Sequence, residues 1–341
     1  MNITTKENSN QPTLSLKTFL ITGATGFIGT NLCLKLLQNG HKIYAIDNHN
    51  SSDPQNLNFI KNFINKNNIL SENFIFYHHD IINPLENLKF DKIDLIYNLA
   101  CPASPPQYQK DPIYTFKTSV WGVENLIQIA LKHQAKILHS STSEVYGDAL
   151  IHPQAENYWG NVNPVGVRSC YDEGKRASET LLYGYCKTQN LNAKIARIFN
   201  TYGPFMDVND GRVVSNFINQ ALRAEDITIY GDGSQTRSFC YIDDLLEILI
   251  KFAESDDDFN GPMNCGNPTE FSVAELADLV IKLTQSSSKI IYKTLPQDDP
   301  KQRRPDISLA QKKYDWRPQI ELEEGLIKTI NYFQNQFLTQ H

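Results

Sequence analysis

Short apolar, β-branched runs alternate with longer segments of helical periodicity along the first part of the chain. The helical segments, in which apolar residues recur at spacings of three and four, are 30–38, 113–133 and 176–189. The apolar runs predict buried strands at 18–22, 42–47, 74–79, 94–100, 136–142 and 193–199. Because strands and helices alternate, we expect an α/β fold with a doubly wound parallel sheet, whose ligands bind at the carboxyl ends of the strands.

The composition changes after residue 200, where loops rich in Gly, Asp and Arg become frequent. We therefore predict a frayed tail at 1–17 and a sheet domain at 18–200, to which the segment around 238–264 returns. The stretches 201–237 and 265–335 are expected to form a smaller C-terminal α/β domain that binds the substrate.

Composition narrows the class of protein. With 341 residues and 40% hydrophobic residues the chain can form a substantial core, and its net charge of -6 argues against a general nucleic-acid binder. Its six cysteines are scattered singly, which predicts reduced thiols in the cytoplasm and no metal site. No apolar stretch reaches the length of a membrane span, so we expect no membrane partner.

A glycine-rich turn joins the first strand to the first helix. Gly23, Gly26 and Gly29 follow strand 18–22 directly, with Phe27 and Ile28 between the last two glycines. Glycines in this context allow a tight turn, and the following helix N-terminus faces a pyrophosphate. The spacing is typical of the Rossmann-type dinucleotide fold of short-chain dehydrogenases, so these five residues are expected to contact a cofactor.

Acidic residues at strand ends indicate which dinucleotide binds. Asp47 ends strand 42–47, where a carboxylate takes both ribose hydroxyls and repels a 2′-phosphate. Asn48 follows it and no arginine lies in 48–50, so we predict NAD rather than NADP. Asp80 either reaches the adenine or caps the next turn. Further cofactor contacts are expected at Ile81, Leu99, Ala100 and Thr118.

Tyr171 and Lys175 are four residues apart at the head of a helical segment, so their side chains share one face. A nearby ammonium stabilises phenolate, which predicts a lowered pKa for the tyrosine. The alternative is an ordinary Tyr/Lys pair on a solvated helix. The end of strand 136–142, with Thr142, Ser143 and Glu144, supplies the rest of a predicted site.

Several motifs together resemble UDP-glucuronate decarboxylases (UDP-xylose synthases) of the extended short-chain dehydrogenase/reductase superfamily. The likeness runs from about residue 18 to about 330. The glycine turn and Y-x-x-x-K mark only the superfamily, whereas the proline-rich loop and the Thr-Ser-Glu triplet are more specific. The motifs are GATGFIG (23–29), LACPASPP (99–106), STSEVYG (141–147), SCYDEGK (169–175), RIFNTYGP (197–204), DGRVVSNF (210–217), YGDGSQTR (230–237) and DDP (298–300).

This resemblance implies oxidation of UDP-glucuronate at C4 by bound NAD, loss of CO2, and re-reduction to UDP-xylose with no net redox change. It implies that Tyr171 is the base and that Lys175 tunes it and holds the nicotinamide ribose. Thr142 would bond the C4 oxygen, and Glu144 would hold the sugar or manage a proton near C5. Related 4,6-dehydratases carry an Asp where Ser143 stands, and a carboxylate there would repel the substrate's own carboxylate.

The resemblance also implies cationic and polar contacts to the substrate. Arg303 would act electrostatically because its pKa is too high for an acid, although the neighbouring Arg304 could be the true counterpart. Any one of these polar residues could instead be a solvated surface residue. The remaining expected substrate contacts are Tyr108, Lys117, Asn200, Arg212, Ser215 and Arg237, with Arg237 at the diphosphate.

Other outcomes stay open at this point. The segment 120–124 departs from the family pattern on a helix that the superfamily uses for dimer packing, and we expect a homodimer. Alternative activities are release of a UDP-4-keto-pentose, 4-epimerisation or 4,6-dehydration. A non-enzymatic alternative is an NAD-sensing regulator on the same fold.

Overall fold

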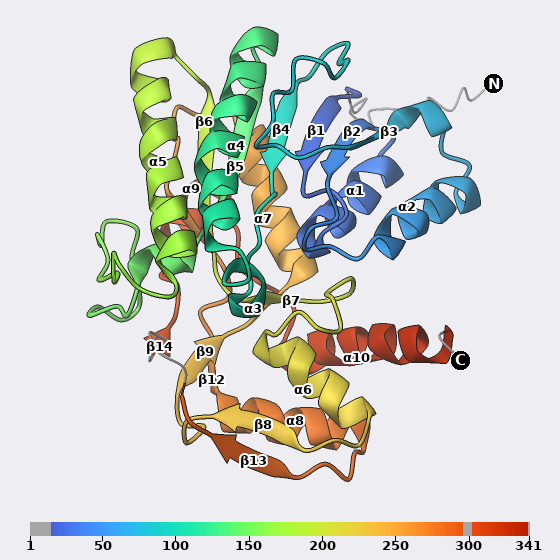
Figure 1. Cartoon of the computed structure of the whole chain (residues 1–341), viewed down its shortest axis with the longest axis vertical. Helices are drawn as coiled ribbons and strands as arrows, with labels where there is room; N and C mark the ends of the chain where they lie inside the picture. Colours follow the sequence, from blue (N-terminus) through green and yellow to red (C-terminus); the bar gives the residue numbers. More distant parts are fainter. Residues whose placement is uncertain (1–14, 296–301, 340–341) are drawn as a thin grey trace, which may run out of the picture.

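The computed structural model describes residues 15–295 and 302–339, so the DDP motif and most of the predicted tail lie outside the described residues. A seven-stranded parallel sheet forms the upper part of the molecule (Figure 1), in the order β11-β6-β5-β4-β1-β2-β3. The predicted doubly wound parallel sheet is therefore confirmed. Its strands are β1 (Thr18–Thr22), β2 (Lys42–Asp47), β3 (Phe74–His78), β4 (Leu95–Asn98), β5 (Lys136–Thr142), β6 (Ala193–Ile198) and β11 (Met263–Cys265).

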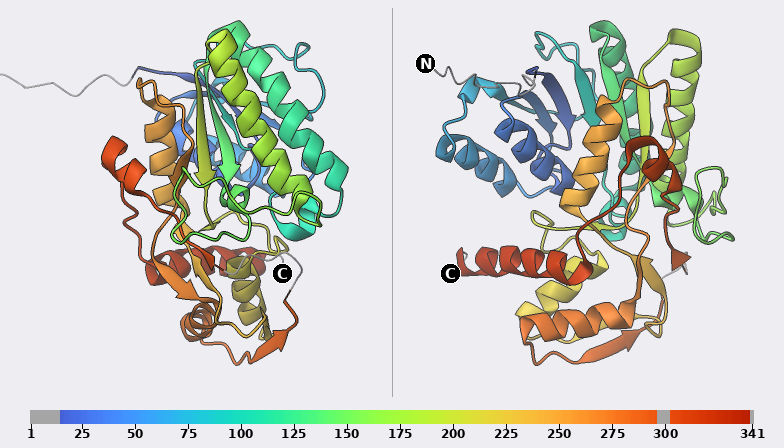
Figure 2. Two further views of the ribbon diagram at one scale, coloured as in Figure 1. Left: turned by 90° about the vertical axis from the view of Figure 1, so that its left-hand side faces the viewer. Right: turned by 180° about the vertical axis from the view of Figure 1, so that it is seen from behind.

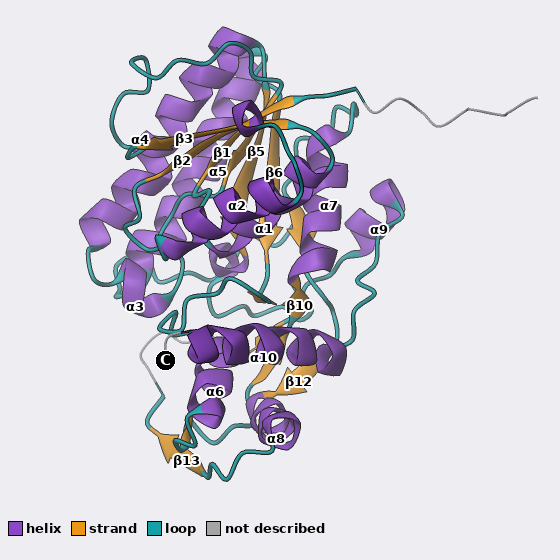
Figure 3. Cartoon of the chain, turned by 90° about the vertical axis from the view of Figure 1, so that its right-hand side faces the viewer, coloured by secondary structure: helices purple, strands orange, loops and turns teal. Residues whose placement is uncertain are grey.

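Helices cover both faces of this sheet, as Figures 2 and 3 show from the side. The helices α4 (Pro112–His133) and α5 (Ser169–Gln189) share one face and pack against each other. The opposite face carries α1 (Phe27–Gln38), α2 (Gln55–Lys66) and α7 (Ile242–Glu254). An apolar core fills each side, because alternate residues of the strands point to opposite faces.

The strand order reverses between β1 and β4. From β1 the chain runs outward through β2 and β3, then returns to β4 on the other side of β1 and continues outward through β5 and β6. Loops that follow β1 and β4 therefore leave the sheet in opposite directions and open a crevice at its carboxyl edge. The functional site is expected at this reversal.

A smaller domain lies below that edge in Figure 1. The short parallel strands β7 (Thr201–Tyr202) and β10 (Cys240–Tyr241) pair where the chain leaves and re-enters the sheet domain. The smaller domain itself contains a parallel pair, β8 and β13, and a three-stranded sheet in the order β12-β9-β14. Its elements are α6 (Val213–Leu222), β8 (Ile227–Tyr230), β9 (Thr236–Ser238), β12 (Glu270–Ser272), α8 (Val273–Thr284), β13 (Ile290–Lys293), β14 (Gln302–Arg303) and α10 (Leu322–Thr339).

One helix that was predicted in the smaller domain packs against the sheet domain. Helix α9 (Ser308–Tyr314) packs against α7 and β11 of the sheet domain, although the whole of 265–335 was expected in the smaller domain. Ala310 and Trp316 are both buried, and burial of their apolar surface favours packing of this segment against the sheet domain. The remaining domain boundaries stay a prediction.

Helix α1 begins at Phe27, three residues earlier than its apolar periodicity indicated. Gly26 has the extended backbone of an N-cap (φ -72°, ψ 176°), so the last part of the glycine motif already belongs to the helix. The helix N-terminus therefore begins inside the motif itself.

Three further features bear on the predicted class of protein. No helix within 15–295 and 302–339 has both the length and the apolar character needed to cross a membrane. In the same residues, no group of three or more His, Cys, Asp or Glu side chains is arranged to hold a metal ion. All six cysteines are free thiols.

Candidate active site

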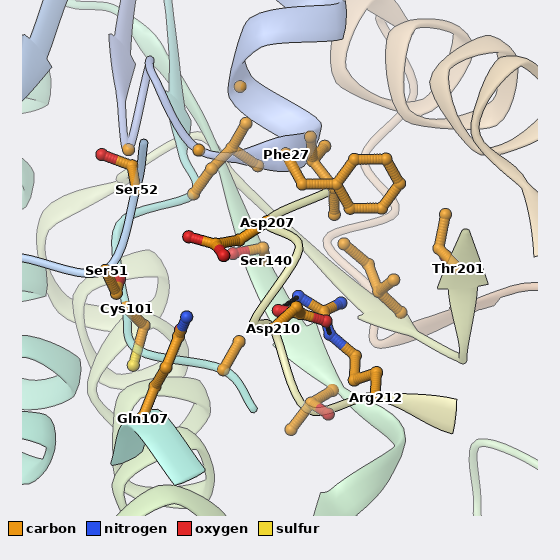
Figure 4. A pocket seen from close by; sticks show the side chains of 18 of the residues that line it. Phe27, Ser51, Ser52, Cys101, Gln107, Ser140, Thr201, Asp207, Asp210 and Arg212 are labelled. Carbon is orange, nitrogen blue, oxygen red and sulfur yellow. Dashed lines mark hydrogen bonds and ion pairs between the residues drawn. The ribbon is translucent and has the colours of Figure 1, made fainter. Parts of the chain in front are cut away.

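A cleft lies at the carboxyl edge of the sheet, between the glycine turn and the start of the smaller domain (Figure 4). Its interior volume is about 180 Å³, and a second, smaller hollow continues from it past Asp47. Arg212 and Asp210 reach the cleft from the smaller domain, opposite Phe27 at the start of α1. Every residue predicted to bind the cofactor lines one of these two hollows.

The glycine turn is shaped for close approach of a ligand. Gly23 has φ +66°, and a Cβ there would lie 2.8 Å from the carbonyl carbon of Leu99. A Cβ on Gly29 would collide with the carbonyl oxygen of Gly23, so only glycine lets the helix start against the turn. No side chain caps α1, which leaves its first backbone N–H groups available to an anion at the lining of the cleft.

Asp47 is held in place by this turn and the loop after β2. Its carboxylate, only 7% exposed, accepts hydrogen bonds from Thr25 N at 3.0 Å, His49 N at 2.8 Å and Ser52 Oγ at 3.0 Å. The described lining of this hollow contains no Lys or Arg. A fixed carboxylate without a nearby cation fits the two ribose hydroxyls of NAD and disfavours a 2′-phosphate.

Asp80 caps the turn that follows it, and its contact with the adenine stays a prediction. Its Oδ1 accepts from Ile82 N at 2.9 Å and caps the turn, while its Oδ2 accepts from Asn48 Nδ2 at 2.9 Å. Asn48 also donates to Tyr114 Oη at 2.6 Å, and all three side chains line the smaller hollow. A polar wall therefore stands where the adenosine half of a dinucleotide would lie.

Tyr171 and Lys175 lie together in the cleft, and both are buried. The ammonium of Lys175 donates to the carbonyl of Ser140 at 2.6 Å and lies 5.9 Å from the centre of the Tyr171 ring. Burial raises the pKa of the Tyr171 phenol and lowers the pKa of Lys175. The predicted lowering of the tyrosine pKa is therefore not found, because desolvation of the phenolate outweighs the distant ammonium.

Glu144 is fixed by two arginines. Its carboxylate pairs with Arg168 at 2.7 Å and with Arg303 at 3.1 Å. Burial opposes ionisation of Glu144, but the charges of Arg303 and Arg168 outweigh it and lower its pKa to about 2. Glu144 is therefore ionised at neutral pH, which disfavours a role as proton donor.

Arg303, not Arg304, reaches this group. Arg303 is 1% exposed and donates from Nη1 to Ser143 Oγ at 3.0 Å as well as pairing with Glu144. Arg304 points away and pairs with Glu270 at 3.5 Å, with its side chain 41% exposed. Of the two neighbours, Arg303 is therefore the one that lies against Ser143 and Glu144, and its contact with the substrate stays a prediction.

Asp172 belongs to the site although the sequence did not single it out. It is 6% exposed in the first turn of α5, and its Oδ1 is buried without a hydrogen-bond partner. Burial, and then the negative charge of Glu144, raise the pKa of Asp172 to about 8. Burial and the charge of Glu144 therefore favour the protonated form of Asp172, whereas the two arginines favour the ionised form of Glu144.

The predicted substrate contacts fall into two groups. Asn200 and Arg212 line the cleft, where Arg212 pairs with Asp210 at 2.6 Å. Tyr108, Lys117, Ser215 and Arg237 do not line the cleft. All but Lys117 make contacts inside the protein. Tyr108 stacks on Tyr171 with ring centres 5.1 Å apart, Ser215 donates to Arg212 O at 3.0 Å, and Arg237 donates to Thr236 O at 2.8 Å.

Lys117 is the one predicted contact that the described structure turns outward. It is exposed on α4, and its ammonium lies 5.2 Å from the ring centre of Trp121, one helical turn further along the helix. This orientation follows from the helical period, because the buried face of α4 is occupied by Thr115, Thr118 and Ser119.

Several residues at the cleft were missed from the sequence. Ser140 and Ser141 precede Thr142 on the same strand end, and Cys101 directly follows Ala100, so extending each strand-end motif by one or two residues would have found them. Arg168, Asp207 and Gln107 come from loops and short helices whose path has no signal in the pattern of apolar residues.

Comparison with known sequences gives consistent matches. Residues 19–266 match the NAD dependent epimerase/dehydratase family. UDP-glucuronic acid decarboxylase 6 of Arabidopsis thaliana is 49% identical over 308 residues, which is 90% of this chain and 86% of the relative. UDP-glucuronic acid decarboxylase 1 of Xenopus tropicalis is 46% identical over 320 residues, covering 94% of this chain and 73% of the relative.

Solved structures match the fold over nearly the whole chain. UDP-glucose 4-epimerase from Thermotoga maritima, solved with UDP-glucose, superposes with a TM-score of 0.83 at 27% identity, covering 94% of this chain and 99% of the other. UDP-glucuronic acid 4-epimerase from Bacillus cereus, solved with UDP-glucuronic acid and NAD, gives 0.79 at 27% identity and the same coverage.

The charge state of Asp172 leads to a prediction about stability. Its folded pKa lies above its unfolded value, so the folded protein binds the extra proton and the free energy of unfolding falls as pH rises from about 4 to about 8. Asp172→Asn mimics the protonated carboxyl and should remove this slope, gaining roughly 1–3 kcal/mol at pH 8 relative to pH 4. Urea unfolding at both pH values measures it, and an equal effect of the substitution at both would contradict the assignment.

Proposed function

The chain belongs to the NAD-dependent epimerase/dehydratase family, and we propose that it decarboxylates UDP-glucuronate to UDP-xylose and CO2. The observation that carries this proposal is the neutral Ser143 beside Glu144, with the guanidinium of Arg303 3.0 Å from the Ser143 hydroxyl. A glucuronate carboxylate entering here would meet the Ser143 hydroxyl, with the buried guanidinium of Arg303 behind it. A carboxylate in place of Ser143 would oppose it by roughly 1–4 kcal/mol at 4 Å.

The redox half of the reaction uses the cofactor end of the cleft. The chemistry that NAD supplies when bound is reversible hydride acceptance from C4, with no net redox change over a full cycle. We assign Tyr171 as the group that exchanges a proton with the C4 hydroxyl, and Thr142 as a hydrogen-bonding partner of that oxygen. Lys175 supplies the buried positive charge that favours a phenolate when the proton moves.

The decarboxylation half follows from the ketone. A C4 carbonyl makes the substrate a β-keto acid, so the electrons of the C5–C6 bond move onto the carbonyl oxygen as CO2 leaves. The resulting enolate then takes a proton at C5. We assign Arg303 an electrostatic role here, since an arginine cannot act as an acid at neutral pH, and we assign Glu144 to holding Arg303 and Arg168.

The diphosphate side of the substrate is assigned to the smaller domain. Arg212 and Asn200 line the cleft below the glycine turn, and Arg237 lies on β9 next to β14, which carries Arg303. Arg212 and Arg237 offset the phosphate charges locally, which the net charge of -6 requires.

We further propose a homodimer that packs through α4 and α5. These two neighbouring helices expose large apolar side chains: Ile113 is 68% exposed, Trp121 49% and Tyr183 61%. Such a surface on adjacent helices suits burial against a second copy. The six free thiols support the predicted cytoplasmic location.

The proposed dimer has a simple test. Light scattering after gel filtration should give twice the chain mass of 38.9 kDa, and Trp121→Glu should shift the protein toward the chain mass by placing a charge in the interface. Ile327→Glu, at a comparably exposed position on α10, is the control and should leave the dimer intact. A wild-type protein that elutes at the chain mass would overturn the proposal.

The activity is tested by product analysis. Incubation with UDP-glucuronate should release CO2 and give UDP-xylose by sugar-nucleotide NMR, with no accumulating NADH. Tyr171→Phe should keep NAD binding but lose at least about 100-fold in turnover, because it cannot exchange the C4 proton. NADH formed one-for-one with CO2 would indicate release of the 4-keto product, and absence of CO2 would return the NAD-sensing regulator to consideration.

Two neighbouring arginines give a matched pair of variants. Arg303→Gln should lower kcat by about 100-fold or more, because it removes a preorganised cation beside Ser143. Arg304→Gln removes the same charge one residue away, at an exposed ion pair, and should change kcat by less than about threefold. Steady-state decarboxylation rates measure both, and equal losses would show that the effect is one of local charge alone.

A further inference from the structure

A histidine is completely buried within the sheet, at the residue directly before Ser140, which lines the cleft. His139 lies on β5 with 0% exposure, on the strand face where Ile137 packs into the apolar core beneath α4 and α5. Burial lowers its pKa well below the ordinary value, with a further contribution from the positive charge of Lys175. An apolar side chain would suit this position better, so the polar ring requires a reason.

Both ring nitrogens of His139 have partners. Nδ1 lies 3.1 Å from Asn98 Nδ2, at the end of β4, and Nε2 lies 2.9 Å from Ser178 Oγ on α5. The amide oxygen of Asn98 accepts from Thr22 Oγ1 at 2.9 Å, which fixes the orientation of the amide. An amide nitrogen can only donate, so Nδ1 must accept and the proton must sit on Nε2.

These hydrogen bonds therefore run in one direction, from Asn98 through His139 and Ser178 to the backbone carbonyl of Lys175. Neutral His139 donates from Nε2 to Ser178 Oγ, and the Ser178 hydroxyl donates to the backbone carbonyl of Lys175 at 2.8 Å. If His139 were protonated, its Nδ1–H and the amide N–H of Asn98 would be two donors facing each other, so the ring must stay neutral.

The contacts close into a ring around Lys175. The ammonium of Lys175 donates to Ser140 O at 2.6 Å, and Ser140 Oγ donates to Asn98 O at 2.8 Å. The main chain of the lysine is thus tied to β4 and β5 through His139, and its side chain is tied to the same two strands through Ser140. Two attachments at opposite ends of a long flexible side chain fix where its ammonium lies.

We infer that His139 is a positioning residue, which as the neutral Nε2–H tautomer holds Lys175 at the cofactor end of the cleft through Ser178 and Asn98. The inference deepens the proposed function, because it concerns the lysine assigned there. It predicts that loss of the imidazole affects NAD binding and the ionisation that governs turnover, in addition to stability.

Three variants separate positioning from plain structural support. His139→Leu leaves the buried Asn98 amide N–H without its acceptor and the Ser178 oxygen without its donor, so Kd for NAD should rise about tenfold and the pH profile of kcat should shift. His139→Gln offers one acceptor and one donor again, and should recover Kd to within about threefold of wild type.

The matched control is His41→Leu. His41 is also buried, 4% exposed, and its Nδ1 accepts from Lys17 N at 3.3 Å, but it lies at the amino end of β2, away from the cleft. It should lower the melting temperature without changing Kd for NAD. If His139→Leu likewise lowers only the melting temperature, with Kd and the pH profile unchanged, the inference is overturned.

A measurement on the unaltered protein covers the case in which His139→Leu fails to fold. Nitrogen NMR of protein labelled at histidine should show the Nε2–H tautomer for His139, assigned by its loss in His139→Gln, with no titration between about pH 5.5 and 8.5. An Nδ1–H tautomer or a titrating ring would overturn the inference. NAD binding is measured without any sugar, so its result stands apart from whether UDP-glucuronate is the substrate.

Discussion

The ion pair between Arg303 and Glu144 is the contact on which the geometry of the site depends. Arg303 lies on β14 beside the smaller domain's β9, whereas Glu144 lies two residues beyond the end of β5 in the large sheet. The Arg303 side chain is 2% exposed and that of Glu144 18%, so breaking the pair would leave the buried guanidinium of Arg303 uncompensated, at a cost of about 3–5 kcal/mol. The two domains are therefore held over the cleft by the same groups that the proposed chemistry uses, and the cleft cannot open widely without separating them.

The cofactor end of the site was predictable because its residues are local in the sequence. Each belongs to a strand end or to the turn after it, and parallel strands place all such ends at one edge of the sheet, so Gly23, Asp47 and Thr142 meet as a consequence of topology. The substrate end depends on contacts between residues far apart in the chain. Arg303 meets Ser143 across 160 positions, and the outward turn of Lys117 depends on the packing of one helix face. No periodicity in the sequence determines the contact of Arg303 with Ser143, whereas the helical period does place Lys117 opposite the buried face of α4.

The charge states were the least predictable part, for a physical reason. Tyr171, Asp172 and Lys175 lie within five residues, and the pattern alone suggests that the ammonium lowers the tyrosine pKa. Desolvation depends on how completely each group is covered, which spacing does not reveal, and here it raises the pKa of Tyr171 and of Asp172 and lowers that of Lys175. All three shifts favour the uncharged form. The site therefore holds its ionised carboxylate at Glu144, where two arginines stabilise the charge.

The cofactor end and the substrate end of the cleft tolerate amino-acid substitutions to different extents. The redox end is built on the sheet interior, where His139, Ser178 and Ser140 leave Lys175 little freedom, so a substitution there disturbs the core as well as the chemistry. The end that decides the fate of the C4 ketone is assembled from a short 3-10 turn and one residue of a two-residue strand, which can vary while the sheet stays intact. A fold shared with 4-epimerases at 27% identity can therefore keep its cofactor end and differ at the substrate end. In this chain the groups at that end are a neutral serine and a buried guanidinium, and these favour a leaving carboxylate.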